Sequence, residues 1–482
     1  MTKKAFVGLA LVALSSATVS AKDARSIVGD VSTTIAAANL KTIQYSGTGF
    51  VYVFGQSYRP GGPYPKFYAK YSRIVDYERG LSREETFRKQ FENPPRGGGQ
   101  QPIYREARGV VVTGENSGWG GSALALTPQG WAKAAMAANP TSKPASLDGK
   151  PVTLVSFLIK GKYKVDGYVD GQNLLTKVNT WMPNPILGDT LVETIYSNYE
   201  DFGGVKFPTR IVQKQGGYPV LEIDVKDVQK NVEASIQPPM TPSSPHVESQ
   251  EIAEGVWYLS GTPDINSVAV EFKDYVVVIE SSVTEERALA NIAEVKRLVP
   301  GKPIRYHINS HHHSDHAAGL RAFVAEGATI ISHEMNKPFY ENVVLRSAHE
   351  LEPDTLSRNP KPAKFIWVKE KYVLTDGQRS LEIYWVHDAG HTANLLMSYM
   401  PKEKLLFVTD VFNQWFDGQH PNDPPPGLVS PYYAALGDNL KRLHLDVERI
   451  APCHGRGVVS IDLLKKALEG TVQAPTIDPT GY

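Results

Sequence analysis

The stretch that decides the fold is residues 309–319, which read NSHHHSDHAAG. A predicted strand precedes these residues and a predicted helix follows them, so they form a loop at the edge of a sheet. His311 and His313 are two positions apart, and an extended segment directs side chains at that spacing to one side. Asp315 and His316 come next, as the chain turns into the helix. The loop therefore gathers four side chains that can bind metal.

Four nitrogen and oxygen donors are more than one metal ion takes from a single loop. A zinc ion uses three or four N, O or S ligands in total, so the loop suits two neighbouring ions with two ligands each. A histidine-rich tract can instead be a solvated loop that binds metal adventitiously. The Asp-His pair at a fixed distance from the first histidines, followed by Gly319 and a helix, favours a ligand loop.

The spacing His-x-His-x-Asp-His resembles the signature of the metallo-β-lactamase superfamily, and the resemblance extends over about residues 250–470. Further candidates occur in the family's order, within the sequences AGHT, LLFVTD and PCHG. The resemblance implies two ligand sets that share one carboxylate: His311, His313 and His391 for a first ion, Asp315, His316 and His454 for a second, and Asp410 bridging both. Two zinc ions are the implied cofactor, with iron or manganese as alternatives.

The resemblance implies a hydrolase. Two cations lower the pKa of a bridging water toward neutrality, and the hydroxide attacks a carbonyl or phosphoryl centre. Asp315 is the predicted catalytic side chain, placed to orient the nucleophile and to pass a proton to the leaving group. Asp410, where other members have Cys or Ser, resembles glyoxalase II, lactonase and phosphodiesterase-type members. We therefore expect an ester, lactone, thioester or phosphoester substrate.

Two departures from the family pattern bear on the surroundings of the site. Glu280 follows the strand VVVI where the family usually has Asp, so the support of the histidine loop is expected to differ. After His391 the chain reads Thr-Ala-Asn rather than the common Thr-Pro-Gly, which leaves the local turn open.

Three alternatives stay open or are disfavoured at this point. A metal-dependent β-lactamase is the first. An iron oxidoreductase of the flavodiiron type would replace a ligand histidine by Glu and add a flavin domain, and neither feature is visible. The third is a non-catalytic, metal-stabilised periplasmic binding protein that carries an apolar ligand. Two bound ions and a turnover that is lost in His311→Ala would favour the enzyme.

All thirteen histidines lie at or after His246, which assigns the chemistry to the second half of the chain. His312 is expected to point away from the metals. The other histidines are expected to be structural, at 307, 387 and 444, or at the surface, at 246, 333, 349 and 420. Cys453 beside His454 is predicted to be a buried structural thiol rather than a ligand.

The fold class is predicted as α+β. After residue 248, strands and helices alternate in an order that suits an αββα sandwich, with two packed sheets and helices outside. The run from 152 to 228 reads instead as six antiparallel strands separated by Gly-containing turns, with an earlier strand at 46–53. Residues 83–92 are predicted to form a helix and 94–101 a mobile loop. Such a sheet around a helix weakly resembles the half-barrel of periplasmic lipoprotein-carrier proteins.

The chain divides into four predicted parts. Residues 1–21 read as a cleavable secretory signal peptide, with Lys3 and Lys4 before an apolar run and small residues up to Ala21. The β-rich domain spans 22–236, a Pro-rich linker 237–247, and the hydrolase domain 248–475. We therefore expect a periplasmic or secreted protein.

The composition of the chain limits the classes of partner that it is expected to bind. Basic and acidic residues number 51 each, so no net charge favours nucleic acid. No later apolar stretch is long enough to anchor the chain in a membrane, and a single cysteine allows no internal disulfide. We expect a small-molecule substrate, bound between loops such as 411–427, where Phe412, Trp415 and Phe416 suggest an apolar lip. The sequence leaves the oligomeric state open.

Overall fold

The computed structural model describes residues 23–99, 101–116, 118–239, 244–262, 265–413, 421–455 and 457–470. The predicted signal peptide, the centre of the predicted linker, Trp415, Phe416 and His420 lie outside the described residues. In the part that is described, no helix has both the length and the apolar character needed to cross a membrane.

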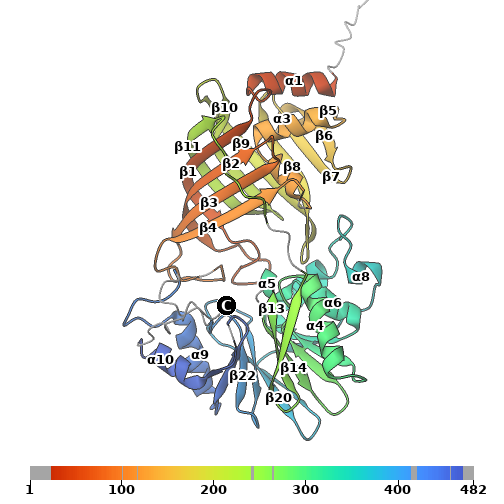
Figure 1. Cartoon of the computed structure of the whole chain (residues 1–482), viewed down its shortest axis with the longest axis vertical. Helices are drawn as coiled ribbons and strands as arrows, with labels where there is room; N and C mark the ends of the chain where they lie inside the picture. The colour runs from red at the N-terminus through yellow and green to blue at the C-terminus, as the bar shows by residue number, and fades with distance from the viewer. Residues whose placement is uncertain are drawn as a thin grey trace, which may run out of the picture.

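The N-terminal domain is one antiparallel sheet of eleven strands in the order β4-β3-β2-β1-β11-β10-β9-β8-β7-β6-β5 (Figure 1). The six strands predicted between 152 and 228 are all present, and the strand predicted at 46–53 is part of β1. The strands are β1 (Thr42–Tyr52), β2 (Lys66–Asp76), β3 (Leu81–Gln90), β4 (Ala107–Gly114), β5 (Thr141–Leu147), β6 (Lys150–Ile159), β7 (Tyr163–Val169), β8 (Leu175–Asn184), β9 (Gly188–Asp201), β10 (Lys206–Gln215) and β11 (Tyr218–Lys230).

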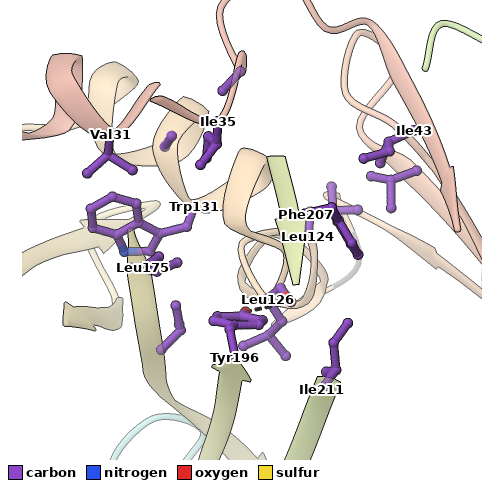
Figure 2. Packing of buried hydrophobic residues seen from close by; sticks show 14 of the residues in the cluster. Val31, Ile35, Ile43, Leu124, Leu126, Trp131, Leu175, Tyr196, Phe207 and Ile211 are labelled. Carbon is purple, nitrogen blue, oxygen red and sulfur yellow. Dashed lines mark hydrogen bonds between the residues drawn. The ribbon is translucent and has the colours of Figure 1, made fainter. Parts of the chain in front are cut away.

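Three helices fill the hollow of this sheet: α1 (Ala24–Thr34), α2 (Gly120–Leu124) and α3 (Pro128–Ala137). Thr127 starts α3 because its side chain accepts a hydrogen bond from the amide of Gly130 and Pro128 fits the first helical turn. Trp131 of α3 is fully buried beside Val31 of α1 and Ile35, the residue that follows α1, and Leu175 of β8 lies below it (Figure 2). The concave face is therefore an apolar core closed by helices.

The helix predicted at 83–92 is wrong, because these residues belong to β3. The charged side chains of this stretch favour a helix in isolation, but pairing with β2 and β4 supplies hydrogen bonds on both sides and partners for the charges. Glu84 lies 3.3 Å from the buried guanidinium of Arg73 on β2. Glu85 pairs with Arg108 on β4. Tertiary pairing thus overrides local propensity.

The C-terminal domain has two facing sheets with helices outside, as predicted. The first sheet runs in the order β12-β13-β14-β15-β16-β17-β18, and the second in the order β19-β20-β21-β22-β23-β24. The strands of the first are β12 (His246–Ala253), β13 (Val256–Thr262), β14 (Ser267–Glu271), β15 (Val276–Ile279), β16 (Ile304–Ile308), β17 (Thr329–His333) and β18 (Lys364–Val368). Those of the second are β19 (Lys371–Thr375), β20 (Ser380–Trp385), β21 (Leu396–Met400), β22 (Leu405–Val408), β23 (Arg449–Pro452) and β24 (Val459–Ser460).

Three apolar clusters hold the layers together. One lies between the first sheet and its helices, a second between the sheets, and a third between the second sheet and its helices. All four residues of β15 are buried, as its continuous apolar run predicts. The helices are α4 (Glu285–Leu298), α5 (Ser314–Ala317), α6 (Leu320–Glu326), α7 (Lys337–Phe339), α8 (Thr355–Arg358), α9 (Pro431–Arg442) and α10 (Ile461–Leu468), with short η1 (Glu334–Asn336) and η2 (Tyr340–Val344).

The loop at 94–101, predicted to be mobile, is anchored where the structure describes it. The amide of Gly97 donates to the carbonyl of Gly390 in the C-terminal domain at 3.0 Å, and the amide of Gly98 to that of Gln56 at 2.9 Å. The side chain of Gln101 donates to three carbonyls of the same loop. The loop therefore packs between the two domains, next to the histidine loop.

Candidate metal centre

The histidine loop connects β16 to α6 and lies at the end of the C-terminal domain that faces the N-terminal domain (Figure 1). Its backbone is fixed by neighbouring strands: the amide of Asn309 donates to Ile331, and the carbonyl of Ser310 accepts from Leu396. The parallel strands β22 and β23 end at the same edge and present Asp410 and His454 there. Topology thus brings three distant segments to one place.

The first predicted ligand set converges. His311, His313 and His391 are buried and place one ring nitrogen each within 4.8 Å of one another. Nδ1 of His313 lies 2.9 Å from Nε2 of His391. His391 comes from the loop between β20 and β21, so two sheets contribute to this group.

The second predicted set converges beside it. Asp315, His316, Asp410 and His454 also offer ligand atoms within 4.8 Å of one another. Nε2 of His316 lies 2.9 Å from Oδ2 of Asp410, and Nε2 of His454 lies 3.3 Å from Oδ1. Asp410 also lies 3.4 Å from His391 and 3.6 Å from His311. Its carboxylate therefore stands between the two groups, where the family resemblance puts a bridging ligand.

Glu280 supports both groups from behind. It is fully buried; its Oε2 accepts from the hydroxyl of Ser310 and lies 3.3 Å from Nδ1 of His316. Because the Ser310 proton goes to Glu280, its oxygen accepts from Nδ1 of His311, 2.9 Å away. Both imidazoles are thereby oriented with Nε2 toward Asp410. The longer Glu280, where the family usually has Asp, is thus part of the scaffold of the site.

Two kinds of group share the site: three imidazoles whose pKa is lowered, and the pair Asp410 and His316, in which each side chain favours the charged form of the other. Burial, with the neighbouring imidazoles, holds the pKa of His311 and His313 well below the usual value, and burial lowers the pKa of His391. Burial opposes ionisation of Asp410, but His391, His316 and His454 outweigh it and hold its pKa well below normal. Burial likewise opposes protonation of His316, but Asp410, Asp315 and Glu280 raise its pKa well above normal.

The residues present fit a metal site. Among the described residues, Nε2 of His311 is buried and makes no hydrogen bond. A buried nitrogen without a partner is costly in a folded protein unless a ligand satisfies it. The set is made of imidazole and carboxylate donors, which zinc, iron and manganese all accept.

Cys453 offers its sulfur to a third possible ligand group, in which its ligand atom and those of His316 and His454 lie within 4.8 Å of one another. Cys453 nevertheless lies on the opposite side of the His316 ring from Asp410. Its sulfur is 3.9 Å from Nδ1, the nitrogen that faces Glu280, whereas Nε2 faces Asp410 and His454. Burial raises the pKa of the thiol to about 12. Its position is that of the buried thiol predicted from the sequence.

Residues 261–454 match the family model of the metallo-beta-lactamase superfamily. The C-terminal domain belongs to this superfamily. The chain is also similar to solved metallo-β-lactamases from Pontibacter korlensis, with 17% identity and a TM-score of 0.36, and from Hirschia baltica, with 20% identity and a TM-score of 0.35. The first match covers 47% of this chain and 98% of the other, the second 48% and 99%. No curated protein matches the chain.

The other histidines that the structure describes belong to none of the possible ligand groups. His312 points away, as predicted: its ring contacts the hydroxyl of Ser57 at 3.1 Å and the side chain of Asn394 at 3.2 Å. Asn394 belongs to the Thr-Ala-Asn turn that departs from the family pattern, so this departure has a local role. His307 is buried in the first sheet, stacked on Phe323.

Two histidines predicted at the surface are buried instead. His333, 2% exposed, accepts a hydrogen bond from the amide of Met335 and so caps the turn after β17. His349, 9% exposed, is covered because its neighbour Ala348 accepts a hydrogen bond from Asp189 of the N-terminal domain. Both side chains are buried by tertiary contacts, which a local sequence pattern does not show.

A cavity of about 690 Å³ opens over Asp315, His391, Asp410 and His454. Of the predicted aromatic lip, only Phe412 is among the described residues, and it is fully buried in the core of the second sheet instead of lining the cavity. The walls come from Tyr432 and Tyr433 of α9 and, on the other side, from the N-terminal domain. The residues of the N-terminal domain that line the cavity include Val53, Phe54, Gln56, Arg88 and Gln101.

These N-terminal residues of the cavity wall cannot be identified from the sequence alone. They belong to no motif with a known chemistry and lie in a half without histidine. The nearest hint is the glycine run in PPRGGGQQ, which indicates a place where backbone approaches another group closely.

Proposed function

We propose that the protein is a dinuclear metal hydrolase that acts on an ester, lactone, thioester or phosphoester, with zinc as the metal. His311, His313 and His391 would hold one ion, Asp315, His316 and His454 the other, and Asp410 both. The observation that supports this most strongly is the position of Asp410, between 2.9 and 3.6 Å from nitrogens of both histidine groups.

Bound ions would supply an activated water and polarise the substrate's carbonyl or phosphoryl oxygen. The chain's own residues would do the rest. Asp315 faces the cavity with 30% of its side chain exposed, so its carboxylate can hold the attacking water and carry a proton to the leaving group. Tyr432, Tyr433, Val53 and Phe54 would shield the reacting groups from bulk solvent.

A carrier function for the N-terminal domain has less support. The concave face of its sheet, where an apolar ligand would lie in a half-barrel carrier, holds α1, α3 and the fully buried Trp131. Export to the periplasm is part of the proposal and is tested separately, by sequencing the N-terminus of the mature protein for cleavage after Ala21.

The central test measures metal content and turnover together. The mature protein, loaded with zinc, is dialysed, its metal counted by mass spectrometry, and its activity surveyed with ester, lactone, thioester and phosphodiester substrates. We expect two ions per chain and turnover of at least one class, both lost in His311→Ala.

The matched control is His387→Ala. His387 is a histidine of the same domain that pairs with Glu370 near the surface and belongs to neither ligand group. It should keep both ions and full activity. One ion per chain and no turnover on any substrate would overturn the proposal.

A further inference from the structure

We propose that residues 55–58 of the N-terminal domain complete the metal centre, and that Gln56 is a positioning residue for Asp315. This inference rests on the proposed function, because Asp315 is a proposed ligand of the second ion. It goes further by giving the N-terminal domain, which has no chemical motif, a defined part in binding metal.

The backbone of residues 55–58 lies along the histidine loop and the His391 loop. The carbonyl of Gly55 accepts from the amide of Ser314 at 3.1 Å. The carbonyl of Ser57 accepts from Nε2 of His313 at 2.8 Å. The carbonyl of Tyr58 accepts from the amide of Ala393 at 2.9 Å. Three successive contacts therefore tie one N-terminal segment to both loops that carry the first ligand set.

The contact with His313 decides which of its nitrogens can bind metal. A carbonyl oxygen only accepts, so Nε2 of His313 carries the proton. Nδ1 is then left with a free electron pair, and this is the atom that lies 2.9 Å from Nε2 of His391. The N-terminal domain thus sets the tautomer of a proposed ligand, as a backbone carbonyl that accepts from the second ring nitrogen does in metal sites generally.

The side chain of Gln56 holds Asp315 in the same way. Its Nε2 donates to Oδ1 of Asp315 at 2.6 Å, and its Oε1 accepts from the amide of Gly99 at 3.1 Å. Because Gly99 can only donate here, the amide of Gln56 has one possible orientation, with its NH₂ group toward Asp315. Oδ1 is therefore occupied, and Oδ2 faces His316 at 3.5 Å.

The glycine loop fits this arrangement tightly. A Cβ atom at Gly98 would lie 1.9 Å from Oε1 of Gln56 and 2.9 Å from Cε1 of His313. The hydroxyl of Tyr432 donates to the carbonyl of Gly97 at 2.9 Å, so α9 closes the loop from the other side. The glycine loop therefore lies directly against both the Gln56 side chain and the His313 ring.

The test compares Gln56→Met and Gln56→Glu with the wild-type chain. Methionine keeps the length and removes both hydrogen bonds. Glutamate keeps an acceptor for Gly99 and sets a second carboxylate against Asp315. The readouts are the affinity of each ion, by chelator competition, and the absorption spectrum of the cobalt-substituted protein, which reports ligand geometry. We expect both variants to bind the second ion at least about tenfold more weakly and to show an altered cobalt spectrum.

The control is Gln213→Met, which removes an amide donor to Thr194 within the same sheet and does not line the cavity. It should bind both ions as the wild type does. Circular dichroism and urea unfolding establish that the Gln56 variants are folded; if Gln56→Met were unfolded, Gln56→Glu carries the test.

The two hypotheses fail in different ways. A wild-type chain that binds fewer than two ions would overturn the proposed function. A wild-type chain with two ions, and folded Gln56 variants with the same affinities and the same cobalt spectrum, would overturn only the inference about the N-terminal domain.

Discussion

The histidine loop and residues 55–58 meet at the same centre but contribute to it differently. The histidine loop offers side chains whose chemistry is specific, because few residue types bind a metal. The N-terminal segment offers mainly carbonyl oxygens, which every residue has, and one amide side chain. Two regions thus meet at the candidate metal centre, and only one of them is recognisable from residue types.

The largest effect is expected at Gly98 of the glycine loop, which packs against one residue of each region, Gln56 and His313. In Gly98→Ala the new methyl group would overlap Gln56 and press on His313, so either the glycine loop or the ligand must shift. We expect metal affinity to fall by more than about 100-fold and the free energy of unfolding by about 2 kcal/mol. Chelator competition and urea unfolding measure the two quantities.

Gly171→Ala is the matched control, because a Cβ there has no neighbour within 4 Å. If Gly98→Ala bound metal as tightly as Gly171→Ala, the two regions would be adjacent but independent.

The next effect concerns support from within the C-terminal domain, at Glu280. In Glu280→Gln an NH₂ group replaces one of the two carboxylate oxygens. In place of Oε2 it removes the acceptor for both Ser310 and His316 and weakens the orientation of both imidazoles; in place of Oε1 it removes the acceptor for Ser281 and Asn309. We expect metal affinity to fall by about 10- to 100-fold. Glu382→Gln, which loses a surface ion pair with Lys371 on the neighbouring strand, should leave affinity unchanged. The metal affinities of Glu280→Gln and Gln56→Met then show whether the site depends more on support from the C-terminal domain or from the N-terminal domain.

The third prediction concerns how the stability of the metal-free protein depends on pH. Every histidine lies in the second half of the chain, so this dependence is expected to arise there. Burial lowers the pKa of His307 to about 3, against about 6.5 in the unfolded chain. Between these values only the unfolded state binds the proton, so stability is full above pH 6.5 and decreases as pH falls. We expect the metal-free protein to lose about 1 kcal/mol per pH unit through this group.

His307→Gln should reduce this loss, because a neutral amide can replace the contact with the carbonyl of Val278. Urea unfolding at pH 7 and pH 5, in chelator, measures the slope. Equal slopes for the variant and the wild type would show that His307 is not the group responsible.

The smallest effect is expected at Cys453. Since its sulfur faces the protonated side of His316, Cys453→Ala should keep two ions and lose only about 1 kcal/mol of stability from the small cavity. Metal counting and thermal unfolding check both. Loss of one ion would instead make the thiol a ligand and would assign the second site entirely to the C-terminal domain.

Much of the fold follows from local patterns. The strands between 152 and 228 are separated by glycine turns, and β15 is a continuous apolar run, so both were predictable. Residues 83–92 were not, because their charges are satisfied by neighbouring strands rather than along a helix. Helices α1, α3 and α9 were not predicted, although local signals mark their first turns. The side chains of Asp23, Thr127 and Ser430 each accept a hydrogen bond from a backbone amide there, and a proline begins α3 and α9.

The candidate site divides in the same way. All seven predicted ligands lie together because histidine and aspartate in a fixed order carry information about metal binding. Gln56 and Ser57 could not be found, since a glutamine and a backbone carbonyl are common everywhere and their role depends on a contact across some 250 positions. Glu280 was noticed only as a departure, and the structure gives it a physical role.

The hydrogen bond between Ser57 and His313 joins residues 256 positions apart. Domains that are joined only by a linker and share no functional contacts can be exchanged during evolution. Here a new first domain would have to bring a carbonyl to the same imidazole and an amide to the same aspartate. The two domains are therefore expected to be inherited together. A C-terminal domain fused to a different N-terminal domain should bind metal poorly until the new domain has evolved the same contacts.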